Sequence, residues 1–160
     1  MSPRPVTILA SMIASITLIS PAFAVDLLTK PYLTLGAARS VMSAAEKEAA
    51  AHGWPCGISV VDAEALPTLT LRTNNASVSA GVEFTPGIAR RAALFRGESG
   101  TLAINGTRPA AITVCGFVLR RGVVPITVNG TVVGAVGVST DTPDHDQRIA
   151  KAGTTALTRK

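Results

Sequence analysis

The side chains of this 160-residue chain that are best suited to binding chemistry are arginines. Arg90, Arg91 and Arg96 lie in one short segment, and Arg120 is followed directly by Arg121. A guanidinium group can pair with a carboxylate through two parallel hydrogen bonds, which suits arginine to the recognition of organic acids. The first three arginines are therefore a candidate carboxylate-binding site, with a solvated helix face as the alternative interpretation. Arg120 and Arg121 are candidates for carboxylate binding on the same grounds.

Two histidines are candidate metal ligands, because imidazole is the commonest metal-binding side chain in proteins. His52 lies where a long helix is predicted to end, so it is either a ligand or a cap that interacts with the negative end of the helix dipole. His145 lies between two aspartates at a predicted helix start, as is typical of a solvated surface histidine. Tyr32 and Met42 are further candidate ligands, although both are more typical of edge or core packing.

The chain has two cysteines, Cys56 and Cys115. They do not form a C-x-x-C motif, so a thioredoxin-like redox site is unsupported. In an exported protein they could form a disulfide, and otherwise they are two small buried hydrophobic side chains. Neither has a neighbouring positive charge in the sequence that would favour the thiolate, which weakens the case for either as a metal ligand.

Other catalytic and metal-binding patterns are absent from the sequence. It contains no H-E-x-x-H motif, no paired Cys/His set and no spaced carboxylate cluster, and no serine in a G-x-S-x-G motif. Gly134 and Gly137 lie inside a strand pattern and not at a helix start, so they do not form a phosphate-binding loop. Glycines at such positions indicate the close approach of another backbone, from a helix or a second subunit.

The first 24 residues are typical of a secretory signal peptide. Arg4 is followed by the apolar run Val6–Ile19 and by the small-residue motif Ala22–Ala24. We expect cleavage to leave a single domain, residues 25–160, in the periplasm or outside the cell. An uncleaved N-terminal anchor is the alternative, although the apolar run is short for a membrane span.

The charge distribution argues against nucleic acid as a partner. The formal net charge of +5 is modest, and aromatic residues make up only 4% of the chain. Proteins that bind nucleic acid usually present a dense basic stripe with interleaved aromatic side chains on which bases stack. We therefore exclude this class.

Three helices are predicted, over residues 35–52, 86–95 and 143–157, and they carry both candidate histidines as well as Arg90 and Arg91. The first has an apolar stripe at three- and four-residue spacing, with Thr34 as N-cap and Gly53 as a left-handed C-cap. Thr85 and Pro86 are predicted as N-cap and first residue of the second helix, because proline is favoured at that position.

The predicted strands are short and are joined by tight turns. They cover residues 57–62, 69–72, 123–128 and 131–138, with further candidates at 101–104 and 111–114. Asn129 and Gly130 join the hairpin in a type I′ turn, because both residue types tolerate the positive φ angles that this turn requires. Hairpin-connected strands form an antiparallel sheet that helices must cover, so the fold class is α+β.

The order of these segments resembles the GlcG/HbpS family of haem-binding proteins, which also occurs as the C-terminal domain of PduO-type corrinoid adenosyltransferases. The matching segments span nearly all of residues 33–153 and read LTLGAARSVMSAAEKEA, GWPCGISVVDAE, RRAALFRG and RGVVPITVNGTVVGAVGVSTDTPDHDQRIAKAG. The most specific is the last, in which the hairpin is followed by T-P-x-x-D.

The resemblance implies profilin-like α/β/α layers around a central antiparallel sheet of about five strands, and assembly into a homo-oligomer. It also implies haem as cofactor, with His52 as candidate axial ligand and the arginines of residues 90–96 as partners of the propionates. The second helix departs from the usual family pattern, with Ile88 in place of a common lysine and Arg91 in place of a threonine. A pocket lined by that helix is therefore expected to differ.

Three hypotheses of function follow from these observations. The first is an exported protein that binds haem for haem or iron handling or redox sensing, and does not act as a catalyst. The second is an enzyme that degrades haem or transforms a small molecule in the same pocket. The third is an interaction module that senses a small carboxylate or docks onto a membrane sensor protein.

Overall fold

The computed structural model describes residues 28–76, 79–98, 116 and 118–158. Its elements are α1 (Leu35–His52), β1 (Gly57–Asp62), β2 (Pro67–Arg72), α2 (Ser79–Phe95), β3 (Val123–Val128), β4 (Thr131–Ser139) and α4 (Pro143–Thr158). The strands form one sheet in the order β2-β1-β4-β3, with every neighbouring pair antiparallel. The α+β class is confirmed.

Four strands lie in the described ranges, against the expected total of about five. The two further candidates, residues 101–104 and 111–114, lie outside the described residues. No helix in the ranges given above combines the length and the apolar character needed to cross a membrane.

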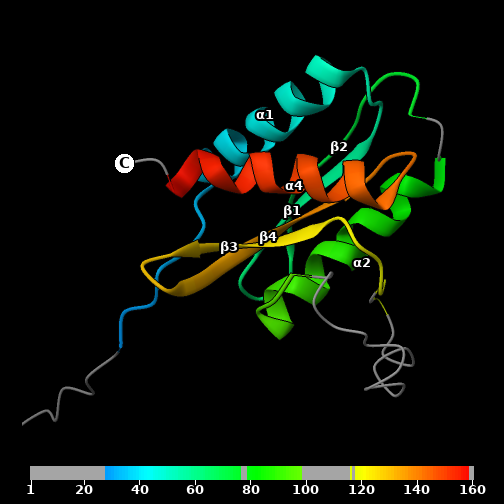
Figure 1. Ribbon diagram of the computed structural model, residues 1–160. Helices are drawn as coiled ribbons and strands as arrows, with labels where there is room; N and C mark the ends of the chain where they lie inside the picture. Colours follow the sequence, from blue (N-terminus) through cyan, green and yellow to red (C-terminus); the bar gives the residue numbers. More distant parts are fainter. Residues whose placement is uncertain (1–27, 77–78, 99–115, 117, 159–160) are drawn as a thin grey trace, which may run out of the picture.

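The helices cover the two faces of the sheet unequally. α1 and α4 pack against each other on one face, and α2 lies on the opposite face (Figure 1). Side chains in a strand alternate between faces, so in β1 Val60 joins the core beneath α1 and α4, whereas Val61 joins the core beneath α2. A residue on α2 is thereby separated by the sheet from one on α1.

Both ends of α1 are where the sequence predicts them. The Thr34 hydroxyl accepts a hydrogen bond from the backbone N–H of Ala37 at 3.2 Å, as an N-cap does. Gly53 adopts the left-handed conformation with φ of 65° and ends the helix. The hairpin turn is also confirmed, since Asn129 and Gly130 have φ of 49° and 78°.

The predicted start of α2 is wrong, because the helix begins at Ser79 and Pro86 lies inside it. Proline has no N–H with which to bond the carbonyl of the residue four positions earlier. Here the Thr85 hydroxyl donates to that carbonyl, on Val82, at 3.2 Å. The same hydroxyl is 2.8 Å from the Ser59 hydroxyl of β1, so a contact with the sheet helps to keep the helix continuous.

The strand glycines allow close backbone packing, as expected. A Cβ at Gly137 would lie 2.5 Å from the Thr85 carbonyl oxygen and 2.7 Å from the Ala89 nitrogen, so α2 rests directly on β4. A Cβ at Gly134 would lie 2.3 Å from the Val61 carbonyl oxygen of the neighbouring strand. The helix that carries the candidate arginines is therefore held tightly against the sheet.

Candidate functional site

Arg91 is the one member of the predicted arginine cluster that is completely buried, with 0% of its surface exposed. It follows Ile88 and Ala89 along α2 and precedes Ala92, and all three of these residues are buried in the core between α2 and the sheet. The close contact of α2 with the sheet fixes the backbone from which the Arg91 side chain extends.

The guanidinium group of Arg91 has no hydrogen-bond partner among the described residues. Its Nε, Nη1 and Nη2 atoms are all buried, and none has a hydrogen-bond partner there. Burial lowers the pKa of Arg91, because the charged form is deprived of water. A buried charge without a partner is strongly unfavourable, and most buried polar groups in proteins are paired. The arrangement is that expected of a site which an anion completes.

Arg90 and Arg96 occupy different environments on the same helix. Arg90 is partly buried, and its Nη1 lies 3.2 Å from the position that a Cβ on Gly116 would occupy. Arg96 is exposed and follows the last residue of α2 with a φ of 54°. The alternative prediction of a solvated face therefore fits Arg96, and it is wrong for Arg91.

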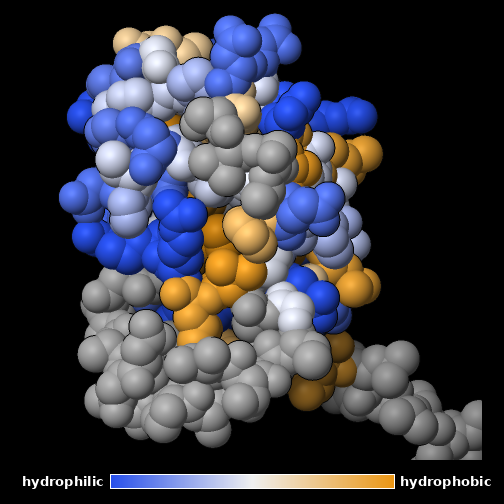
Figure 2. Space-filling view, turned by 90° about the vertical axis from the view of Figure 1, so that its right-hand side faces the viewer, coloured by the Kyte–Doolittle hydropathy of each residue, from blue (hydrophilic) through white to orange (hydrophobic). Residues whose placement is uncertain are grey.

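Apolar surface accompanies the buried charge on α2. Phe84, Leu94 and Phe95 expose 42%, 48% and 40% of their surfaces. Figure 2 shows a strip of hydrophobic residues between hydrophilic surfaces on the side of the molecule where α2 begins. A carboxylate carried on a large apolar body would match both features, whereas a small inorganic anion would match only the guanidinium.

His52 lies at the end of α1, on the other face of the sheet from the arginines. Its Nδ1 is 3.0 Å from the Glu48 carbonyl oxygen, and its Nε2 is 2.9 Å from Nη2 of Arg148 on α4. Arginine can only donate, so Nε2 accepts and Nδ1 donates. Both nitrogens are thus engaged, and the contact of Nδ1 with a carbonyl in the last turn of α1 fits the capping interpretation. The structure does not bring His52 together with the arginines, and its role as axial ligand stays a prediction.

The sequence did not reveal an aromatic stack that joins α1 to α4. Trp54 lies between His52 and His145, with ring centroids 4.4 Å and 3.8 Å away and nearly parallel planes. His145 is also held by Asp141, whose Oδ1 is 2.8 Å from its Nδ1. The only local signal is the H-x-W spacing at the end of α1, because His145 comes from a helix that is distant in sequence.

Asp146 explains the T-P-x-x-D motif as a structural anchor. Its side chain is fully buried, and Oδ1 accepts a hydrogen bond from the backbone N–H of Thr140. Arg120 approaches the other carboxylate oxygen to 3.6 Å, but burial dominates and raises the pKa of Asp146. A Cβ at Gly122 would lie 2.4 Å from Cβ of Asp146, so only glycine fits. The motif thus connects the start of α4 to the residues that directly precede β3.

The remaining candidate ligands have ordinary structural roles. Cys56 is buried, and this burial is the main cause that raises its pKa to about 11, so the thiol is protonated at neutral pH. Its predicted partner Cys115 lies outside the described residues. Met42 is part of the core beneath α1, and Tyr32 is 68% exposed. In the portion of the chain with a described position, no three His, Cys, Asp or Glu side chains gather to hold a metal ion.

These features define a small α+β domain with a buried guanidinium on one helix that has no hydrogen-bond partner among the residues whose positions are described. Residues 33–155 match the family model described as haem degrading protein HbpS-like. The chain therefore belongs to the HbpS-like family, and the resemblance seen in the sequence is confirmed.

Individual relatives agree with this assignment. The chain is 32% identical to protein GlcG of Escherichia coli strain K12 over 114 residues, which cover 69% of this chain and 84% of GlcG. A crystal structure of HbpS superposes with a TM-score of 0.79 at 27% identity, covering 86% of this chain and 99% of that one. A PduOC–haem complex shares the fold, with a TM-score of 0.70 at 22% identity over 79% of this chain and 95% of that one.

Proposed function

We propose that this protein binds haem on the α2 side of the sheet and that Arg91 pairs with a haem propionate. The observation that carries the proposal is the buried guanidinium without a hydrogen-bond partner in the described residues. A propionate would supply the missing charge-assisted hydrogen bonds. The exposed apolar residues of α2 suit the porphyrin ring, which is large and hydrophobic.

Of the groups that haem carries, the described residues account for a propionate and leave the axial ligand unassigned. α2 itself contains no His, Cys, Met or Tyr, so an axial ligand has to come from another segment. When bound, haem would supply an iron centre suited to redox or oxygen chemistry. The contribution we assign to Arg91 is to bind and orient the ligand.

The physiological setting that we propose follows the signal pattern of residues 1–24. On this proposal the protein is exported to the periplasm or beyond, forms a homo-oligomer, and acts in haem or iron handling or in redox sensing with a membrane sensor protein. The description of the family as haem-degrading favours a second candidate, an enzyme that breaks down haem in the same site. A site for a small organic acid is the third candidate, because it requires only Arg91.

Titration with haemin of the chain from Val25 onward, which retains every described element, tests the proposal. We expect a Soret band that shifts and saturates near one haem per subunit. Haemin dimethyl ester, which lacks the carboxylates, should bind much more weakly than haemin. Arg91→Lys, which keeps the charge but not the planar fork, should weaken haemin binding and leave ester binding unchanged.

Each candidate predicts a different result in these assays. Loss of the Soret band on addition of reductant and oxygen would favour the degrading enzyme. No spectral shift at micromolar haemin would refute both haem functions and favour the organic acid. Equal binding of haemin and its ester would refute the role assigned to Arg91.

A further inference from the structure

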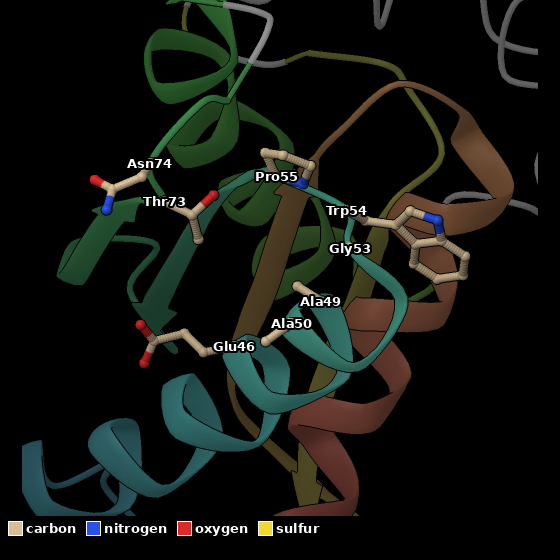
Figure 3. Close-up of a pocket in the computed structure, with 8 residues that line it drawn as sticks. All are labelled: Glu46, Ala49, Ala50, Gly53, Trp54, Pro55, Thr73 and Asn74. Atoms are coloured by element: carbon tan, nitrogen blue, oxygen red, sulfur yellow. The ribbon is translucent and has the colours of Figure 1, made fainter.

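A groove outside the α2 site lies between the C-terminal half of α1 and the segment that follows β2. Its volume is about 270 Å³. Figure 3 shows the eight residues that line it, namely Glu46, Ala49, Ala50, Gly53, Trp54, Pro55, Thr73 and Asn74. The groove belongs to the face of the sheet that α1 covers, so it is separate from Arg91.

Small side chains keep the groove open. Ala49 and Ala50 form the α1 wall, and Gly53 turns the chain at the end of the helix so that Pro55 forms the next wall. The Trp54 ring does not fill the space, because it points away from the groove toward α4 (Figure 3). The groove is therefore a feature of the backbone path and does not depend on the rearrangement of a large side chain.

Hydrogen bonds between Thr73 and Cys56 hold the segment after β2 at a fixed separation from the segment that contains Pro55. The Thr73 hydroxyl accepts from the Cys56 backbone N–H at 2.7 Å and lies 3.2 Å from the Cys56 carbonyl oxygen. The Thr73 backbone N–H donates to that same carbonyl at 2.9 Å. Binding sites for small molecules are usually preformed in this way.

The rim of the groove carries a negative charge that is not neutralised. The Glu46 carboxylate has no ion pair or hydrogen bond to any residue in the described ranges, whereas the Glu48 carboxylate accepts a hydrogen bond from Nε of Arg148 at 2.7 Å. In Figure 3 Glu46 extends from α1 and Asn74 from the segment after β2, so the two side chains come from opposite walls of the groove. The Glu46 carboxylate is a hydrogen-bond acceptor beside the apolar wall of Ala49 and Ala50.

Two cations adjoin the lining residues along the chain, Lys47 on α1 and Arg72 before Thr73. Adjacent side chains on a helix do not face each other, so Lys47 is not placed to pair with Glu46. Arg72 precedes Thr73, and side chains in β2 alternate between the two faces of the sheet. Leu69 and Leu71 pack into the core beneath α1, whereas Thr70 bonds to Ser59 in the layer beneath α2. Arg72 lies two residues after Thr70, so its side chain extends toward the same face of the sheet, the one that α2 covers.

We propose that this groove binds a small organic cation, such as an alkyl amine in its ammonium form. The ammonium group would be held by the Glu46 carboxylate, and the alkyl chain would lie against Ala49, Ala50 and Pro55. A single carboxylate does not make a metal site, and it would repel an anion. The volume is just below the usual range for ligand pockets, which excludes haem and other large ligands.

NMR titration with n-butylammonium tests this inference on the chain from Val25 onward. We expect saturable shifts of backbone amides confined to Ala49, Gly53, Thr73 and Asn74. The neutral analogue n-butanol should bind at least about tenfold more weakly, as expected for loss of a charge-assisted hydrogen bond. Glu46→Gln should weaken n-butylammonium binding by a similar factor.

Two further variants separate this site from a general charge effect. Glu83→Gln removes an exposed carboxylate on α2 and should leave binding unchanged. Ala50→Leu fills the groove without altering Glu46, and should abolish binding. Equal binding of n-butanol and n-butylammonium, or binding that survives both Glu46→Gln and Ala50→Leu, would overturn the proposal. Neither result would bear on haem binding, because the haemin titration depends on Arg91.

Discussion

Replacement of Arg91 by methionine should make the ligand-free protein more stable and the ligand complex weaker. Methionine is unbranched and flexible, so it can follow the path of the arginine stem without its charge. The variant removes three buried nitrogen atoms that lack hydrogen-bond partners in the described structure. Stability and binding should therefore move in opposite directions, which a purely structural arginine would not produce.

The size of the stability gain follows from the burial. An unsatisfied buried polar group costs about 1–3 kcal/mol, and a charged group costs more. We therefore expect Arg91→Met to raise the free energy of unfolding by at least about 1 kcal/mol. For a domain of this size that gain corresponds to a rise in Tm of about 3–5 °C.

The expected loss of binding is larger than the gain in stability. Truncating one partner of a buried, hydrogen-bonded charge pair costs about 2–5 kcal/mol. This corresponds to a Kd for haemin that is about 30- to 5000-fold higher. Esterified haemin should bind both proteins equally, since it has no carboxylate to lose.

Thermal unfolding followed by circular dichroism, with and without haemin, measures both effects. Arg39→Met is the matched control, because Arg39 is exposed on α1, and its effect should stay within about 0.5 kcal/mol. A variant at position 91 that unfolds at a lower temperature and binds haemin as tightly as the parent would refute the reasoning. It would mean that Arg91 has a structural partner in the free protein.

Three further predictions concern packing, thiol reactivity and acid stability. In urea unfolding, Gly137→Ala should cost about 1–3 kcal/mol because its methyl group meets the backbone of α2. Gly36→Ala is the matched control, because its methyl group would make only an ordinary contact at 3.9 Å, and it should be neutral or stabilising. Equal effects of the two substitutions would contradict the packing account. In a Cys115→Ser background, Cys56 should resist a thiol reagent at pH 8 while folded, because its pKa is raised to about 11, and it should react in urea; rapid reaction of the folded form would refute this. Hydrogen bonding, chiefly to a histidine, lowers the pKa of Asp141 to about 2, so its stabilisation should be complete above about pH 4 and be lost as the pH falls through 2. The urea midpoint of Asp141→Asn should depend less on pH over that range than the midpoint of the unmodified protein. An identical pH dependence in the two proteins would be evidence against a stabilising role of the Asp141 carboxylate.

Much of the fold was predictable because its signals are local. The ends of α1 depend on a hydroxyl and a glycine within the same turn of chain, and the β3–β4 hairpin depends on two adjacent residues that accept positive φ. The start of α2 was not predictable in this way. Thr85 and Pro86 are typical of a helix start, but the contact of the Thr85 hydroxyl with Ser59 on a distant strand favours a helix that continues through them.

The sequence by itself determined the family, the α+β class and the segment in which the candidate arginines lie. Those properties depend on residue types and on spacings within a few residues. Only the tertiary structure distinguished Arg91 from Arg90 and Arg96, because burial depends on which side of α2 meets the rest of the molecule. It also separated His52 from these arginines, since the side of the sheet on which a helix packs is decided by long-range contacts and not by its own residues.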